Sequence, residues 1–111
     1  MTRDELIAAL QAASGPDRSI DFELCELSAA GVKEAELTGH IRHYTSSIDA
    51  ALTLVPDGAF HGVGMTISLP PETLATCSLY RDGYCAVFGY GNTPALAACI
   101  AALKAMEDKH D

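Results

Sequence analysis

The spacing of apolar residues changes near Gly58 and again near Thr93, and this change limits the folds open to the chain. Before Gly58 apolar residues recur every three or four positions, which is typical of amphipathic helices. Between about 60 and 90 they alternate with small or polar residues, as in strands that bury one face. After Thr93 the spacing is helical again. We therefore predict one α+β domain over residues 1–111, an α/β/α-type sandwich with a small antiparallel sheet of about three strands, N-terminal helices and one C-terminal alanine-rich helix.

Three helices are predicted before the sheet, over about residues 2–14, 19–29 and 46–55. Thr2 and Glu5 have the spacing of a capping box for the first helix. Gly31 is expected to end the second helix, and the segment 32–44 is predicted to be a loop with a short strand around Ile41.

The third helix has start and stop signals of its own. Ser46 is expected to accept hydrogen bonds from the first-turn amides, with Asp49 reaching back to complete a capping box. Its predicted buried stripe is formed by Ile48, Leu52 and Val55, with help from Ala51. Pro56, Asp57 and Gly58 then stop the helix and reverse the chain.

Three strands are predicted over about 60–69, 74–80 and 84–90, followed by a helix over about 94–108 that Thr93 caps. The register of the last two strands depends on their loop. A two-residue turn at Asp82-Gly83 gives two mixed faces, whereas a three-residue loop pairs Tyr80 with Tyr84. We favour the second register because it gives one consistently apolar face.

In the favoured register the two faces differ sharply in composition. One carries Ala75, Cys77, Leu79, Cys85 and Val87, and we predict that the last helix covers it. The other carries Thr76, Ser78, Tyr80, Tyr84, Ala86, Phe88 and Tyr90. The N-terminal helices are expected to cover this aromatic face. If they leave part of it exposed, Tyr80, Tyr84, Phe88 and Tyr90 become candidates for a protein interface.

The chain is strongly acidic, with 15 Asp and Glu against 7 Lys and Arg and a formal charge of -8. This is the wrong sign for neutralising phosphates, so we expect no direct binding to nucleic acid. Acid is dense between residues 17 and 36, at Asp17, Asp21, Glu23, Glu26, Glu34 and Glu36. This set is interpreted either as a solvated face or as an interface for a basic partner.

No motif predicts catalysis, a cofactor or a metal. The four cysteines contain no C-x-x-C pair and are expected to be reduced thiols. His40, His43 and His61 lack the ligand spacing of a zinc site. The start MTRDELIAALQAA lacks a signal-peptide layout, and no apolar run reaches the ~20 residues that a bilayer span requires.

Three segments resemble a known family. They are ASGPDRSID at 13–21, YTSSIDAALTLVPDG at 44–58 and NTPALAACIAALKAM at 92–106, and they resemble small phage and prophage proteins that carry a phage ABA sandwich domain. The resemblance implies a helix, sheet, helix sandwich and the cytoplasm of a bacterial host. It brings no established activity and no site residues. The middle of the chain, 60–91, departs from the resemblance.

Three functions are consistent with these features. The first is a non-enzymatic accessory protein that binds a host or phage protein, with an anti-CRISPR-like inhibitor of host defence on a basic nucleic-acid-binding surface as its concrete form. The second is a structural or assembly accessory of the phage particle. The third, an enzyme or small-molecule binder, is disfavoured because no convergent polar cluster is visible.

Overall fold

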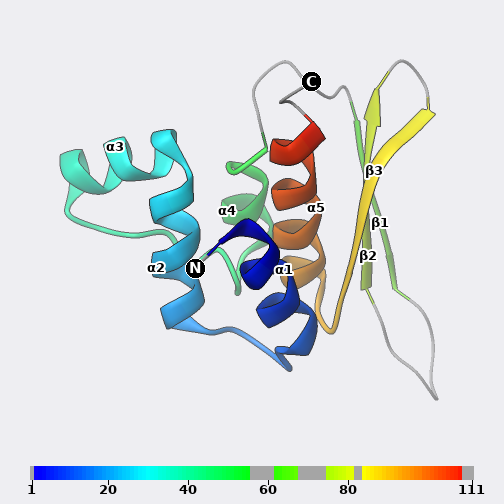
Figure 1. Ribbon diagram of the computed structural model, residues 1–111, viewed down its shortest axis with the longest axis horizontal. Helices are drawn as coiled ribbons and strands as arrows, with labels where there is room; N and C mark the ends of the chain where they lie inside the picture. The colour runs from blue at the N-terminus through cyan, green and yellow to red at the C-terminus, as the bar shows by residue number, and fades with distance from the viewer. Residues whose placement is uncertain (1, 56–61, 68–74, 82–83, 109–111) are drawn as a thin grey trace.

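The computed structural model describes residues 2–55, 62–67, 75–81 and 84–108. Within these residues the elements are α1 (Arg3–Ala12), α2 (Arg18–Leu27), α3 (Ala29–Thr38), α4 (Ile48–Leu52), β1 (Gly62–Ile67), β2 (Ala75–Arg81), β3 (Tyr84–Gly91) and α5 (Pro94–Asp108). The three strands form one antiparallel sheet in the order β1-β2-β3. The predicted α+β class is confirmed (Figure 1).

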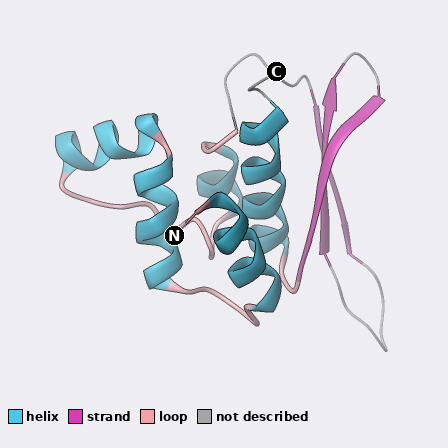
Figure 2. Cartoon of the chain, viewed as in Figure 1, coloured by secondary structure: helices cyan, strands magenta, loops and turns pink. Residues whose placement is uncertain are grey.

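All described helices lie on one side of the sheet. Figure 2 shows α5 next to the sheet, α1 and α4 on the side of α5 away from the sheet, and α2 and α3 farthest from the sheet. The N-terminal helices therefore do not cover the aromatic face, contrary to our expectation. α1 and α4 pack on α5 instead, because α5 is apolar around its whole circumference over residues 95–103 and offers them a second buried surface, while α2 packs on α1 and α3 on α2.

The close contact between α5 and β3 depends on two glycines. A Cβ atom on Gly89 would lie 2.7 Å from the backbone nitrogen of Ala101, and one on Gly91 would lie 2.7 Å from that of Ala97. Alanines along α5 are fully buried against the face that carries Cys77 and Leu79. The prediction that the last helix covers this face is confirmed, since small residues on both sides let the helix approach.

The three-residue loop predicted between β2 and β3 is wrong. The predicted composition of the two sheet faces is correct for the described side chains. Arg81 pairs with Tyr84, and Tyr80 pairs with Cys85, as a short turn requires. A bulge then shifts the register so that Leu79 pairs with Val87. Ala86 is the extra residue of this bulge. Without it, a regular ladder would have mixed apolar and aromatic residues on both faces. The turn residues themselves lie outside the described part.

The segment predicted to be a loop is a helix. Ser28 ends α2 and caps α3, accepting a hydrogen bond from the Gly31 amide at 3.1 Å. Gly31 lies in the first turn of α3 and does not stop α2, and Ile41 is in no strand. α3 ends at Gly39, whose φ of 75° is the left-handed conformation that glycine adopts most easily.

Two other helices start one or two residues away from their predicted starts. α2 starts at Arg18, one residue before the predicted start, and Asp17 caps it. α4 starts at Ile48, two residues after the predicted start, and Ser47 caps it in place of Ser46. In α4 the buried residues are Ala50 and Ala51. Ile48 is exposed, so the predicted stripe is wrong at this position, whereas Leu52 and Val55 are partly buried and pack against the core.

The boundaries of the other helices agree with the sequence. Thr2 and Glu5 form the capping box of α1, and the Thr93 hydroxyl caps α5. Thr93 is followed by α5 over the predicted range.

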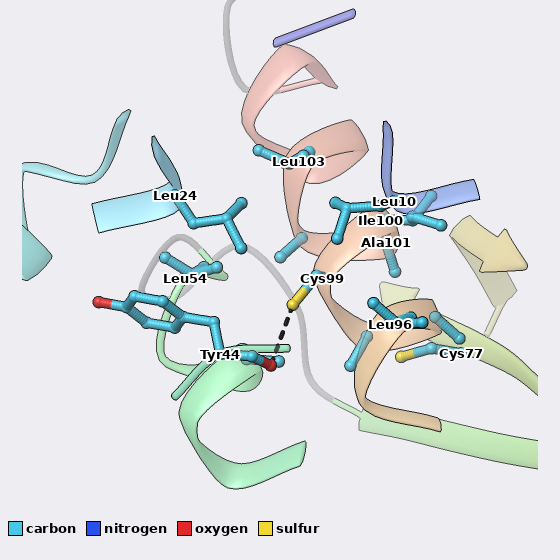
Figure 3. Packing of buried hydrophobic residues seen from close by; sticks show 14 of the residues in the cluster. Leu10, Leu24, Tyr44, Leu54, Cys77, Leu96, Cys99, Ile100, Ala101 and Leu103 are labelled. Carbon is cyan, nitrogen blue, oxygen red and sulfur yellow. Dashed lines mark hydrogen bonds between the residues drawn. The ribbon is translucent and has the colours of Figure 1, made fainter. Parts of the chain in front are cut away.

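The core surrounds α5, with one part between α5 and the sheet and the other between α5 and the N-terminal helices. Leu10 and Leu24 from α1 and α2 meet Leu103 and Ile100 from α5, and all four are fully buried (Figure 3). The Cys99 thiol donates a hydrogen bond to the Tyr44 carbonyl oxygen at 3.2 Å. This contact holds the segment before α4 against α5.

Candidate interaction surfaces

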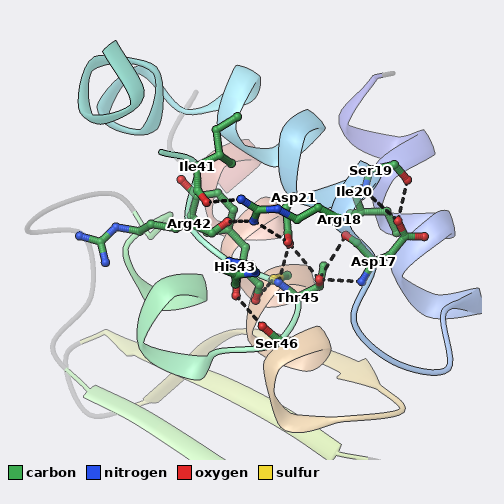
Figure 4. Close-up of polar contacts among 12 residues, drawn as sticks. Asp17, Arg18, Ser19, Ile20, Asp21, Ile41, Arg42, His43, Thr45 and Ser46 are labelled. Atoms are coloured by element: carbon green, nitrogen blue, oxygen red, sulfur yellow. Dashed lines mark hydrogen bonds and ion pairs between the residues drawn. The ribbon is translucent and has the colours of Figure 1, made fainter. Parts of the chain in front are cut away.

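Asp21, one of the predicted interface residues, is buried inside the molecule. Only 2% of it is exposed. Its carboxylate accepts hydrogen bonds from the Thr45 amide and hydroxyl, both at 2.8 Å, and from Arg18 at 3.1 Å (Figure 4). A buried carboxylate needs such partners, so the role of Asp21 is to hold the segment before α4 against α2.

Arg18 and Asp17 complete this network. The Arg18 guanidinium donates to the carbonyl oxygens of Ile41 at 2.6 Å and Arg42 at 3.1 Å. The Asp17 carboxylate caps α2, and the Asp17 amide donates to the Thr45 hydroxyl at 2.8 Å. The hydrogen bond from the Ser19 side chain, with those from two backbone amides, lowers the pKa of Asp17. Asp17 is thus also structural.

The remaining predicted carboxylates differ in their surroundings. Glu34 accepts a hydrogen bond from Arg42 at 2.8 Å, and this ion pair raises the pKa of Arg42. Glu23 lines a shallow groove of about 380 Å³ beside α1. Glu26 and Glu36 are exposed. The acidic set therefore does not act as one surface, and Glu26 and Glu36 remain its candidates for contact with a partner.

The aromatic face of the sheet is open in the described part of the chain. Tyr80, Phe88 and Tyr90 are 37%, 44% and 47% exposed. The rings of Phe88 and Tyr90 meet edge to face, with centroids 5.2 Å apart. The Tyr80 ring lies across Gly64, where a Cβ atom would come within 3.2 Å of it. These three side chains form the open aromatic face, and the side chain of Tyr84 lies outside the described residues.

Lys104 extends the open aromatic face at the β3 edge. Its ammonium group lies 5.7 Å from the centre of the Phe88 ring, within the range of a cation–π contact. Lys104 could not be predicted from the sequence, because nothing local indicates that a residue of α5 reaches a ring on the other side of the sheet. Arg18 and Thr45 were missed for the same reason, since their partners lie more than 20 residues away.

The acidic residues of α2 and α3 are separated in space from the aromatic face. Every aspartate and glutamate of the described residues lies in a helix or at a helix cap, and the three strands contain none. Asp57, Glu72, Asp82 and Asp111 lie outside the described part. In Figure 1 the sheet and α3 are at opposite ends of the molecule. A partner that binds the aromatic face therefore need not touch Glu26 or Glu36.

The described side chains offer little nucleophilic or metal chemistry. Cys25, Cys77 and Cys99 are buried, and burial raises the pKa of all three thiols, that of Cys77 to about 11. Such thiols are protonated near neutral pH and react slowly. No group of three or more His, Cys, Asp or Glu among the described residues could hold a metal ion. His40 and His43 are exposed, and His61 lies outside the described part.

Comparisons with protein-family models, with curated proteins and with solved structures find no match to this chain. The resemblance to proteins with a phage ABA sandwich domain therefore stays a prediction. None of the helices in the described ranges has the length and apolar character needed to cross a lipid bilayer.

Proposed function

We propose that this protein is a non-enzymatic phage or prophage accessory protein that acts by binding another protein. Its concrete form is an anti-defence inhibitor, of the anti-CRISPR kind, that occupies a basic nucleic-acid-binding surface in the cytoplasm of a bacterial host. The open aromatic face is the observation that carries this proposal.

The open aromatic face has the composition of a binding surface. Tyrosine and phenylalanine are enriched at protein interfaces, because a large ring buries much apolar area at a small cost in side-chain entropy. Tyr80, Phe88 and Tyr90 lie together on one face, and no described helix covers them. Isolated exposed apolar residues are ordinary on protein surfaces, whereas a group of three rings on one face of a sheet supports an interface.

The net charge of -8 supports a basic partner. Opposite net charge accelerates the encounter of two proteins and favours one class of partner over others. Glu26 and Glu36 are exposed on α2 and α3, and they would add to this attraction even from a site outside the contact. A surface that binds nucleic acid is rich in Lys and Arg, so it has the complementary charge.

The proposal is tested by affinity purification from a lysate of the host bacterium, together with a phage-interference assay. We expect the wild-type protein to recover a basic nucleic-acid-processing complex and to protect phage from host defence. Phe88→Ser with Tyr90→Ser should abolish both effects. Phe22→Ser is the matched control, since Phe22 is 46% exposed on α2 and far from the sheet.

Two results would overturn the proposal. The first is recovery of no such complex, together with no protection of phage. The second is equal loss of binding in Phe22→Ser and in the double variant of the aromatic face. A double variant Glu26→Gln with Glu36→Gln distinguishes long-range electrostatic attraction from direct contact in the complex. It should slow association and leave the dissociation rate unchanged.

A further inference from the structure

Lys104 places a positive charge at the open aromatic face. Its ammonium group lies 5.7 Å from the centre of the Phe88 ring, and Phe88 is 44% exposed. Lys104 itself is half-buried, because the helix that carries it packs closely on β3. A cation over a ring gains from the negative face of the π-system. The ring therefore holds the end of an otherwise flexible side chain beside Phe88 and Tyr90, whose rings are in contact.

The described sheet offers this ammonium group no carboxylate. The three strands contain one charged residue, Arg81, which is also basic and whose side chain lies outside the described residues. No described carboxylate lies within ion-pair distance of Lys104. The acidic helix α3 lies at the opposite end of the molecule (Figure 1). The open aromatic face is thus neutral to basic in its described part, although the whole chain has a net charge of -8.

Burial of the open aromatic face in a complex would also bury the end of Lys104. A protein that covers the Phe88 ring also covers a group that lies 5.7 Å from its centre, so the ammonium group loses part of its water shell. A charge that leaves water needs an opposite charge or hydrogen bonds to offset the loss. The ring covers one side of the ammonium group, which has three N–H donors. The other donors need an acceptor that the described face lacks.

We propose that Lys104 determines which proteins the open aromatic face accepts, because a bound partner has to present an aspartate or glutamate to its ammonium group. A carboxylate is the best match, since hydrogen bonds between charged groups are about twice as strong as neutral ones. A partner with apolar groups alone at this point would leave the charge unpaired, and one with lysine or arginine would add repulsion. The inference rests on the proposed function, in which the open aromatic face is the contact.

A local preference for a carboxylate is consistent with a partner that is basic as a whole. Net charge acts at long range and sets the rate of encounter, whereas groups in direct contact set the rate of dissociation. The acidic helices and the open aromatic face lie apart, so they can perform these two roles separately. The partner is thus a basic protein that carries an acidic residue beside an apolar patch.

Lys104→Met tests the role of the charge. Methionine keeps most of the apolar stem beside Phe88 and removes the ammonium group. The immobilised probe is the complex that the wild-type chain recovers from the host lysate, and we expect the variant to dissociate from it at least tenfold faster. Association should not slow, because the variant is more acidic than the wild type. Lys33→Met is the matched control, since Lys33 is exposed on α3 and the same change of charge there should leave dissociation unchanged.

Zero-length crosslinking of the wild-type complex gives a second measurement that needs no substitution. A water-soluble carbodiimide activates a carboxylate, which then forms an amide bond with a lysine amine in direct contact, while the carbodiimide takes up the water as a urea. Mass spectrometry of the peptides should find Lys104 joined to an aspartate or glutamate of the partner protein. Lys33 should be joined to no residue of that protein.

An acceptor within this chain is the main alternative, and a further control tests it. Glu107 and Asp108 follow Lys104 by three and four positions, and their side chains lie outside the described residues. Glu107→Gln with Asp108→Asn should leave dissociation unchanged. An acceleration equal to that of Lys104→Met would overturn the inference, because it would place the acceptor in this chain.

The remaining outcomes separate this inference from the proposed function. Dissociation of Lys104→Met at the wild-type rate would show that Lys104 turns into solvent in the complex, and it would overturn the inference. A crosslink to the partner protein through Lys33 in place of Lys104 would do the same. If Phe88→Ser with Tyr90→Ser abolishes binding while Lys104→Met does not weaken it, the proposed function stands and this inference alone fails. Recovery of no complex overturns both.

Discussion

Replacement of Gly89 by alanine should strongly destabilise the fold. The added Cβ atom would lie 2.7 Å from the Ala101 backbone nitrogen, 2.8 Å from Ile100 Cγ2 and 2.9 Å from the Ala97 carbonyl oxygen. Two of these three atoms belong to the backbone of α5 and cannot rotate away. The helix must therefore retreat from β3 by about 0.7 Å to restore ordinary contact.

The magnitude follows from two opposing effects. Overpacking of a core costs about 1–3 kcal/mol, and the upper end applies here because the clash is with backbone. Gly89 has no positive φ, so alanine gains about 0.4–1 kcal/mol from the smaller entropy of the unfolded chain. We expect the free energy of unfolding to fall by about 2 kcal/mol, with a decrease in Tm of about 8–12 °C.

Urea denaturation followed by far-ultraviolet circular dichroism measures this change. Gly62→Ala is the matched control, because its Cβ would lie 3.6 Å from the nearest atom of Tyr80, an ordinary contact in a strand of the same sheet. It should leave the free energy of unfolding within about 0.5 kcal/mol of wild type. Equal midpoints for Gly89→Ala and Gly62→Ala would refute the close approach of α5 to β3.

Three further substitutions test other parts of the structure. Asp21→Ala leaves the buried Thr45 amide without its acceptor and should lower the free energy of unfolding by about 3 kcal/mol. Denaturant titration should show almost no change for the control Glu26→Ala, because Glu26 is exposed. Ser28→Ala removes the cap of α3 and should cost about 1 kcal/mol, with earlier hydrogen exchange in α3 than elsewhere. Burial raises the pKa of Cys77 from 9.0 to about 11, so the unfolded chain ionises first and stability should fall between pH 9 and pH 11. A comparison of the pH slopes of wild type and Cys77→Ala isolates this thiol, and identical slopes would contradict its burial.

Local signals in the sequence predicted the elements well where partners lie close along the chain. Thr2 with Glu5, and Thr93 with Pro94, define helix starts by contacts within one turn, and both are confirmed. The same kind of signal was available for α3, since Ser28 can cap it and Gly39 can end it. Gly31 was interpreted as a stop because glycine is unfavourable in helices, although it lies under the Tyr44 hydroxyl, where a Cβ atom would come within 2.9 Å.

Long-range contacts explain what the sequence did not predict. Asp21 and Glu26 have the same chemistry in the same helix, yet one is buried and one is exposed, because Thr45 lies above Asp21 only in the folded chain. The aromatic composition of one sheet face followed from the alternation of residues. The exposure of this face could not be predicted, because it depends on which side of the sheet the helices pack against.

The place of α5 along the chain has a consequence for synthesis on the ribosome. α5 contacts α1, α4 and all three strands, and it follows every other described element in sequence. Leu6 and Leu10 near the start of the chain are buried only when the layer that contains α5 is complete. A nascent chain that stops before Pro94 therefore exposes the apolar sides of its helices and of its sheet. The core forms only after translation has passed residue 105.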